Sequence, residues 1–313
     1  MKSAQINEYG DASVIEIKDV EKPSLKPGQV LVEVYASSIN PFDTSIRAGY
    51  MKEMIPLELP VTLGGDIAGI VVEVSEDVTD IVVGDKVYGQ ANVVAGNSGA
   101  FAEYSATKAS QIAKAPANTD FNESASLPLV GVSAFQALTE HIQLKQGQKI
   151  FIHGGAGGIG TVAIQIAKNI GAYVATTATG EGIDYVKSLG ADEVVDYKTQ
   201  DFSEVLSDYD AVFDAVGGDD FNKSFTLLKK NGVAVTMIAE PDETRAKELG
   251  ITVVRQSTHV TTDHLLALAK LVEEGVVTPH VDAVFSLDEI QKAFELRESG
   301  AVKGKVVIEI KKT

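Results

Sequence analysis

A run of glycines between an apolar strand and a helix limits the fold of this chain more than any other feature. Residues 149–153 read as an apolar strand, five glycines follow within residues 154–160, and residues 161–170 carry a helical pattern. Three of the glycines fit G-x-G-x-x-G in the setting that binds the diphosphate of a dinucleotide. The N–H groups and the positive helix end would face the phosphates. The predicted diphosphate site consists of Gly155, Ala156, Gly157, Gly158, Ile159 and Gly160.

The glycines have separate tasks in this prediction. A side chain at position 157 would stand where the diphosphate must approach the backbone, and Gly160 lets the helix lie close to the strand. The alternative is a glycine-rich turn that binds nothing, because such a pattern is weak on its own. The flanking strand and helix supply the context that favours dinucleotide binding.

Strand and helix patterns alternate through the middle of the chain. Besides the elements around the glycines, strands are expected at 173–177, 193–195, 211–214 and 233–238, and helices at 133–141, 182–189 and 221–228. Strands that read as unbroken apolar runs are typical of a parallel sheet buried on both faces. The pattern therefore predicts a doubly wound parallel sheet of the Rossmann type.

The two ends of the chain have a different character. Short β-rich runs bounded by proline and glycine predict a β-barrel or sandwich-like lobe, with strands at 29–36, 69–74, 85–89 and 100–105. In the tail, helices are expected at 263–274 and 287–296. The last strand, 305–310, is expected to return to the first lobe rather than to complete another βαβ unit. The length of 313 residues agrees with about two domains.

Composition removes several classes of function. The net charge of −17, from 44 acidic and 27 basic residues, disfavours nucleic acid and membrane partners. The chain has no cysteine, which excludes disulfides and cysteine-based zinc sites. The five histidines show no metal-binding spacing, so no metal site is expected. Residues 1–6 lack the apolar stretch of a secretory signal, so we expect a cytoplasmic protein.

The residues after the second strand of the middle region bear on the cofactor. In this fold an acidic residue there binds the ribose 2′-hydroxyl of NAD. Residues 175–180 contain none, and Thr177 and Thr179 have hydroxyls that can donate to a 2′-phosphate. We therefore expect NADP(H). No lysine or arginine stands beside the threonines and Glu181 follows closely, so NAD or dual specificity is the alternative.

Several motifs together resemble the medium-chain dehydrogenase/reductase superfamily, in its zinc-free quinone oxidoreductase branch, which is related to zeta-crystallin. The resemblance covers nearly the whole chain. Besides the glycine loop, it is carried by residues 40–44 (NPFDT), 46–49 (IRAG), 63–69 (LGGDIAG), 83–87 (VGDKV), 99–104 (GAFAEY), 214–218 (DAVGG) and 303–308 (KGKVVI). These motifs are far more specific together than any one of them alone.

The resemblance implies an α/β protein with a GroES-like β-rich catalytic domain plus a Rossmann domain, and an active site in the cleft between them. The catalytic domain would comprise residues 1–122 and 266–313, and the Rossmann domain residues 123–265. In zinc-dependent relatives the stretch around Asn40 supplies a cysteine ligand and residues 63–66 supply a histidine; both are missing here. The expected chemistry is direct hydride delivery from the cofactor to an acceptor that is already electrophilic.

The resemblance also implies individual site residues. It places Asn40 near the nicotinamide and Ser133 near the nicotinamide or the phosphates, with Tyr50 as a weaker candidate for a substrate wall or proton donor. Tyr197 would lie beside the adenosine phosphate, and Asp66 would organise the first lobe through hydrogen bonds. The remaining expected cofactor contacts are Val216, Gly217, Ile238, Ala239 and, as a charge for the diphosphate, Lys305. Surface or packing roles are the alternatives for Tyr50, Tyr197 and Lys305.

Three functions are consistent with these features. The first is an NADPH-dependent quinone reductase, and the second is a reductase of the carbon–carbon double bond of enones or 2-alkenals. The third is a protein of another class, a non-catalytic NADPH-binding sensor or interaction protein, including an RNA-associated one. A homodimer is expected, with the β-rich segment 232–238 pairing across the interface or lying inside the sheet.

Overall fold

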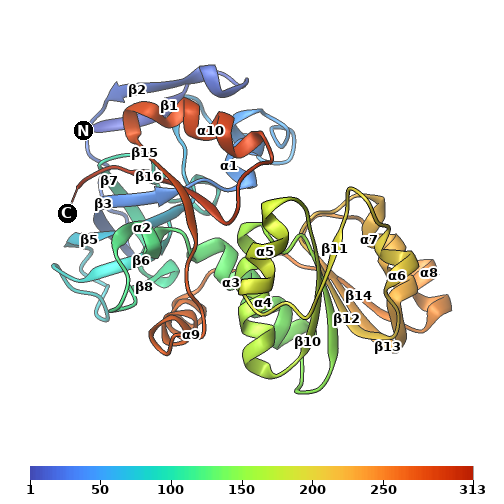
Figure 1. Ribbon diagram of the computed structural model, residues 1–313. Helices are drawn as coiled ribbons and strands as arrows, with labels where there is room; N and C mark the ends of the chain where they lie inside the picture. Colours follow the sequence, from blue (N-terminus) through green and yellow to red (C-terminus); the bar gives the residue numbers. More distant parts are fainter. Residues whose placement is uncertain (313) are drawn as a thin grey trace. The chain divides into compact units, whose positions relative to one another are not determined.

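The computed structural model describes residues 1–312, and these form two compact units (Figure 1). Unit 1 comprises Met1–Leu129, Val260–Glu274 and the chain from Pro279 on; unit 2 comprises Val130–His259 and Gly275–Thr278. Unit 1 is thus built from both ends of the chain. The short piece Gly275–Thr278 joins unit 2 through two hydrogen bonds, because Gln165 Nε2 donates to Thr278 O and Thr278 N donates to Gln165 Oε1. The domain boundaries expected from the sequence stay a prediction.

Unit 2 contains a parallel sheet of six strands. In spatial order the strands are β11 (Glu193–Asp196), β10 (Tyr173–Ala178), β9 (Lys149–His153), β12 (Tyr209–Asp214), β13 (Leu228–Thr236) and β14 (Thr252–Arg255). The central strand β9 is buried along Ile150, Phe151 and Ile152, as expected for a strand covered on both faces. The strand order reverses at β9, so the doubly wound Rossmann-type sheet is confirmed.

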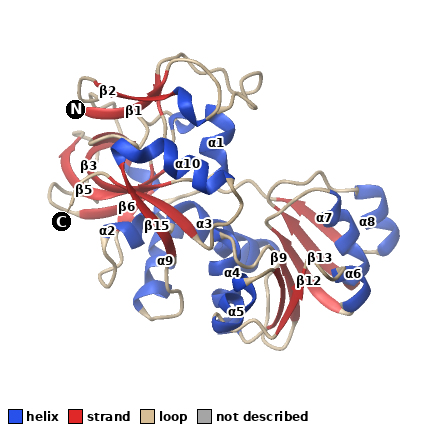
Figure 2. Cartoon of the chain, turned by 45° about the horizontal axis from the view of Figure 1, so that its top comes forward, coloured by secondary structure: helices blue, strands red, loops and turns tan. Residues whose placement is uncertain are grey.

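Helices cover both faces of this sheet. Figures 1 and 2 show α4 and α5 on one face and α6, α7 and α8 on the other. Their bounds, with α3 before them in the chain, are α3 (Pro128–Gln136), α4 (Gly158–Ile170), α5 (Glu181–Ser188), α6 (Phe202–Val205), α7 (Asp219–Lys223) and α8 (Glu243–Leu249).

One expectation for unit 2 was partly wrong, and for the segment 232–238 the structure decides between the two alternatives in favour of a strand inside the sheet. The helix expected at 221–228 is the short helix α7 followed by a 3₁₀ turn, and Leu228 already belongs to β13. This turn keeps Phe221, Phe225 and Leu227 in the core, so packing outweighs helical propensity here. The segment 232–238 does not provide a free edge, because β13 pairs with β12 on one side and with β14 on the other.

Unit 1 is β-rich. Its larger sheet runs β15 (Val281–Ser286), β16 (Lys305–Glu309), β3 (Gln29–Ser38), β5 (Asp66–Val74), β6 (Lys86–Gln90) and β8 (Ile112–Lys114), and β7 (Tyr104–Lys108) also pairs with β3. A smaller sheet contains β2 (Ile15–Asp19), β1 (Lys2–Ile6) and β4 (Val61–Thr62). The expected return of the last strand is confirmed, because β16 pairs antiparallel with β3.

Four helices complete unit 1: α1 (Pro41–Arg47), α2 (Phe121–Ala125), α9 (Thr262–Glu273) and α10 (Ile290–Glu298). The tail was expected not to form a βαβ unit, and this was wrong. β15 and β16 are parallel neighbours joined through α10. The pattern of β15 was missed because this edge strand alternates half-buried and exposed residues and has no apolar run.

The strand expected at 100–105 lies further along the chain, as β7. The N–H groups of Ala100 and Phe101 instead bind Leu63 O, and Ala102 makes only an isolated bridge to Ser3. No helix within residues 1–312 combines the length and the apolar character needed to cross a membrane.

Candidate functional site

The glycine loop joins the end of β9 to the start of α4. Gly157 is the residue before the first helical turn, and the helix runs for 13 residues from Gly158. The first N–H groups of a helix lack partners within the helix, so this turn presents donors and the positive end of the helix dipole. The expected strand, turn and helix context of the motif is present.

Packing explains two of the three motif glycines. A Cβ atom at Gly155 would lie 2.1 Å from Thr176 Oγ1, and one at Gly160 would lie 2.2 Å from Gly154 O. A Cβ atom at Gly157 would meet nothing closer than Gly154 O at 3.5 Å, and the backbone there has φ −76°, which any residue adopts. Within residues 1–312, nothing requires a glycine at position 157, so the space before it is open to a ligand.

A residue at the end of β10 fixes the start of the glycine loop through a hydrogen bond. The hydroxyl of Thr177 accepts a hydrogen bond of 2.9 Å from Gly154 N, and the side chain is buried. Thr179, which is partly buried, donates its hydroxyl to the Asp196 carboxylate, and this bond holds the pKa of Asp196 below its usual value. Tyr197, the next residue, is 56% exposed.

Asp196 was missed by the sequence analysis. That analysis searched for a carboxylate after β10, whereas Asp196 ends the neighbouring strand β11 and lies opposite Ala178 in the sheet. Only the pairing register of β10 and β11 identifies Asp196 as a neighbour of this site, and the sequence of β10 alone does not contain that register.

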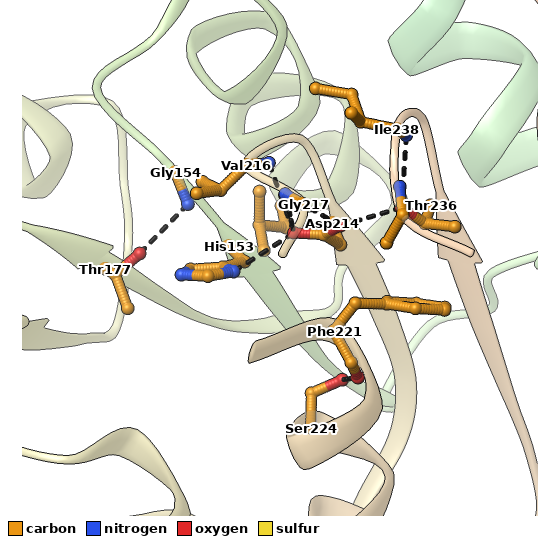
Figure 3. Close-up of polar contacts among 12 residues, drawn as sticks. His153, Gly154, Thr177, Asp214, Val216, Gly217, Phe221, Ser224, Thr236 and Ile238 are labelled. Carbon is orange, nitrogen blue, oxygen red and sulfur yellow. Dashed lines mark hydrogen bonds and ion pairs between the residues drawn. The ribbon is translucent and has the colours of Figure 1, made fainter. Parts of the chain in front are cut away.

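Two further loops follow β12 and β13 at the same edge of the sheet (Figure 3). Val216 reaches over the glycine loop, because a Cβ atom at Gly154 would lie 2.7 Å from its Cγ2. Ile238 lies against Gly217, at 3.2 Å from a Cβ atom built there. The side chains of Val216 and Ile238 are 52% and 54% exposed, whereas Gly217 and Ala239 are buried.

Ser133 lies inside unit 2, on α3. Its side chain is buried, and its Oγ lies 2.7 Å from Thr258 Oγ1, while its carbonyl accepts a hydrogen bond from Gln256 Nε2. The structure thus brings the glycine loop, Thr177, Val216, Gly217, Ile238 and Ala239 to one edge of the sheet in unit 2. The other candidates, Asn40, Tyr50 and Lys305, belong to unit 1.

A buried charged cluster surrounds Asn40 in unit 1. Lys305 Nζ donates to Asn40 Oδ1, to Ile39 O at 3.0 Å and to Asp66 Oδ2 at 3.3 Å. Asn40 Nδ2 donates to Asp66 Oδ2 at 2.8 Å. The Lys305 ammonium, with three hydrogens and three acceptors, is therefore saturated, and the residue is only 5% exposed. The alternative that Lys305 is a solvated surface residue is wrong.

Asp66 is the centre of this cluster and has the organising role expected for it. Its carboxylate also accepts from Ser38 Oγ at 2.8 Å and from Leu129 N at 3.0 Å. Four donors, one of them charged, thus replace the water that the buried carboxylate has lost.

Asp43 gives the cluster a dependence on pH. Burial raises its pKa to about 7, and Asp66 adds to the rise, while the hydrogen bond from Asn40 N and the charge of Lys305 oppose it. Between about pH 4 and 7 the folded state holds a proton that the unfolded state has released, so the stability that Asp43 contributes falls as the pH rises.

We therefore expect D43N to flatten the pH dependence of stability. Urea unfolding at pH 5 and pH 8 measures it: the wild type should lose more free energy of unfolding toward pH 8 than D43N does. Asparagine keeps an oxygen that can accept from Asn40 N. Parallel curves for the two proteins would show that Asp43 does not titrate in this range.

Tyr50 follows α1 in a turn and is 79% exposed. The alternative in which it packs on the β-rich lobe does not hold for its side chain. Its role at a substrate wall or as a proton donor stays a prediction.

A zinc ion does not fit the cluster around Asn40. Zinc takes lone pairs from nitrogen, sulfur or oxygen ligands, whereas Asn40 Oδ1 and Asp66 Oδ2 here share the Lys305 ammonium. A second cation in this place would be repelled by that ammonium. In the described part of the chain, no group of three or more histidine, aspartate and glutamate side chains is arranged to hold a metal.

The fold and the glycine loop define a class, the two-unit dehydrogenases and reductases that bind a dinucleotide. Two family models match the chain: the alcohol dehydrogenase GroES-like domain over residues 26–117 and the zinc-binding dehydrogenase family over residues 189–308. The chain belongs to the medium-chain dehydrogenase/reductase superfamily, in its zinc-free quinone oxidoreductase branch.

Individual relatives agree with this placement. The 2-methylene-furan-3-one reductase of Solanum lycopersicum is 35% identical, over 98% of this chain and 79% of its own. The chloroplastic NADPH-dependent alkenal/one oxidoreductase of Arabidopsis thaliana is 34% identical over the same shares, 98% and 79%. The structure of the quinone oxidoreductase from Coxiella burnetii superposes with a TM-score of 0.92, at 33% identity and with 99% of each chain covered.

Proposed function

We propose that the chain is an NADPH-dependent oxidoreductase that works without zinc and reduces a quinone or a similar electrophilic acceptor. The observation that carries the proposal is the open space before Gly157, at the start of α4. Packing accounts for Gly155 and Gly160, and a ligand that approaches the backbone would account for Gly157.

The residues of unit 2 fit such a cofactor. The N–H groups of the loop 155–160 bind the diphosphate, and the α4 dipole favours its charge. Thr177, Thr179 and Tyr197 lie toward the adenosine phosphate, while Val216, Gly217, Ile238 and Ala239 line the groove at the carboxyl ends of the strands. Ser133 and, from unit 1, Asn40 are assigned to the nicotinamide side. Bound NADPH would supply a hydride.

The buried cluster of unit 1 changes the role proposed for Lys305. Its ammonium is saturated by Asn40, Ile39 and Asp66, so we assign it to fixing the Asn40 amide and not to a direct contact with the diphosphate. Asn40 Oδ1 accepts from Lys305 and Asn40 Nδ2 donates to Asp66, so the orientation of this buried amide is fixed.

The choice between NADP and NAD depends on Thr179 and its neighbours. The Asp196 carboxylate would repel a 2′-phosphate and already accepts the hydrogen of the Thr179 hydroxyl, which would have to turn from Asp196 to bind the phosphate. The Thr177 hydroxyl accepts from Gly154 N and keeps its own hydrogen for donation. We propose NADP(H), as the names of relatives of this chain indicate for those proteins. A ratio of kcat/KM for NADPH over NADH measures this preference.

Turnover tests the function. Purified protein mixed with NADPH and a panel of quinones and enones should lose absorbance at 340 nm with at least one acceptor. The two groups of acceptors separate quinone reduction from the reduction of enone or 2-alkenal double bonds, the second candidate, which the names of two relatives favour. Bound NADPH without turnover of any acceptor would instead support a sensor or interaction protein.

Two properties of the protein stay proposals alongside its function. We propose a homodimer, to be measured by light scattering; among the described strands of the unit 2 sheet, β14 and β11 are the outer ones and each has one neighbour. The second is a cytoplasmic location, which fractionation of cells tests, since several relatives are named as chloroplastic or mitochondrial proteins.

A further inference from the structure

The carboxylate of Asp214 has no part in the proposed chemistry, yet it is buried at the edge of the sheet where the cofactor is placed. It ends β12, the strand next to β9, and therefore lies close to the glycine loop. A buried carboxylate is costly unless hydrogen bonds replace its water, so its partners show what it serves.

Both oxygens of Asp214 accept from the loop after β12, and each also contacts the end of a different neighbouring strand (Figure 3). Oδ1 accepts from Val216 N and Gly217 N at 3.1 Å and lies 3.0 Å from His153 Nδ1 at the end of β9. Oδ2 accepts from Gly217 N and from the hydroxyl of Thr236, at 2.7 Å, at the end of β13. One carboxylate thus ties together the ends of three adjacent strands.

Thr236 extends this network to the next loop. Its hydroxyl gives its hydrogen to Asp214 and accepts from Ile238 N at 3.2 Å and from Ala239 N at 3.0 Å. The backbone of the loop after β13 is therefore held through Thr236 to the same carboxylate that holds the loop after β12.

The side chains at the tips of these loops face outward. Val216 and Ile238 are large apolar residues that remain about half exposed, next to Gly154 and Gly217 respectively. The carboxylate fixes the backbone of these loops, while their apolar side chains stay accessible to a ligand. A preformed apolar surface for a flat ring requires both properties.

We infer that Asp214 and Thr236 are positioning residues for the cofactor: they hold the loops 215–218 and 237–239 so that Val216 and Ile238 form a fixed apolar wall beside the glycine loop. The inference rests on the proposed function. It assigns Asp214, Thr236 and His153 a purpose that the sequence did not indicate. The network acts before binding, so it sets cofactor affinity more than the rate of turnover.

Thr236→Val tests the inference, because valine keeps the shape of threonine and removes its hydroxyl. We expect the KM for NADPH to rise about tenfold with kcat changed far less, because valine removes the donor to Asp214 and the acceptor of Ile238 N and Ala239 N. Thr236→Ser restores the hydroxyl and should bring KM most of the way back.

A matched control separates this effect from a general loss of stability. Thr107, on β7 of unit 1, is also buried and donates its hydroxyl to a carbonyl, that of Gln90. Thr107→Val should lower the melting temperature without a change of KM for NADPH. Equal KM values for folded Thr236→Val and the wild type would overturn the inference.

If Thr236→Val does not fold, a measurement on the wild type can show whether the loops 215–218 and 237–239 are fixed before the cofactor binds. Hydrogen exchange without cofactor should show the amides of Val216, Gly217, Ile238 and Ala239 already protected. Rapid exchange that slows only with NADPH would overturn the inference. If the wild type neither binds nor oxidises NADPH, the proposed function fails, whatever the state of these amides.

Discussion

Gly157→Val is expected to weaken NADPH binding by about 100-fold or more while the protein still folds. The backbone at Gly157 has an ordinary conformation, and a Cβ atom there meets no atom of the described chain closer than 3.5 Å. The side chain would instead fill the space before α4 and keep a diphosphate from the loop N–H groups. Losing two charge-assisted hydrogen bonds weakens binding by on the order of 100-fold or more.

The readout needs both binding and folding. Titration calorimetry with NADPH gives the affinity, and the melting temperature without cofactor should stay close to that of the wild type. Gly160→Val is the contrasting variant: its side chain would collide with Gly154 O, so it should lower the melting temperature strongly. Undiminished NADPH affinity in Gly157→Val would remove the main support for the proposed cofactor site.

Lys305→Met is expected to destabilise unit 1 severely. The substitution leaves the buried Asp66 carboxylate without its cationic partner, and Asn40 Oδ1 without a donor. Removing one member of a buried ion pair costs about 3–5 kcal/mol of the free energy of unfolding. Urea unfolding measures the loss, and expression at low temperature provides enough folded protein to compare.

Two variants show whether the buried charge is responsible. Lys311→Met removes a lysine that pairs with Glu33 at the surface, where such a pair contributes about 0–1 kcal/mol. Adding Asp66→Asn to Lys305→Met removes both charges and should recover part of the stability. If Lys305→Met loses no more free energy of unfolding than Lys311→Met, the stability of the buried cluster does not depend on the Lys305 ammonium.

The Rossmann unit was predictable because its signals are local. The apolar run of β9, the glycines and the amphipathic α4 are contiguous, and each restricts the next. The same argument located β10 and β12 to within two residues. The predicted ends of elements were wrong where tertiary packing determines the local structure. Leu228 is an example, because it continues a helical pattern but is the first residue of β13.

The partners within the site were not predictable in the same way. Asp196 reaches Thr179 only because β11 pairs in register with β10, and Asp214 reaches Thr236 only because β13 lies beside β12. Lys305 illustrates the same limit, since a lysine in a terminal strand gives no sign that Asn40 and Asp66 will surround it. Contacts between distant segments require the topology, which single-sequence patterns do not contain.

The position of β16 has a consequence for the order of events during synthesis. β3 is translated before unit 2, whereas its neighbour β16 and Lys305, the partner of Asp66, are translated after unit 2. All of unit 2 is translated before β15 and β16, so it can fold while unit 1 still lacks these two strands. Until β16 has been made, the part of β3 that pairs with it stays an open edge and the Asp66 carboxylate lacks its lysine. We expect chaperones to protect these parts of the nascent protein.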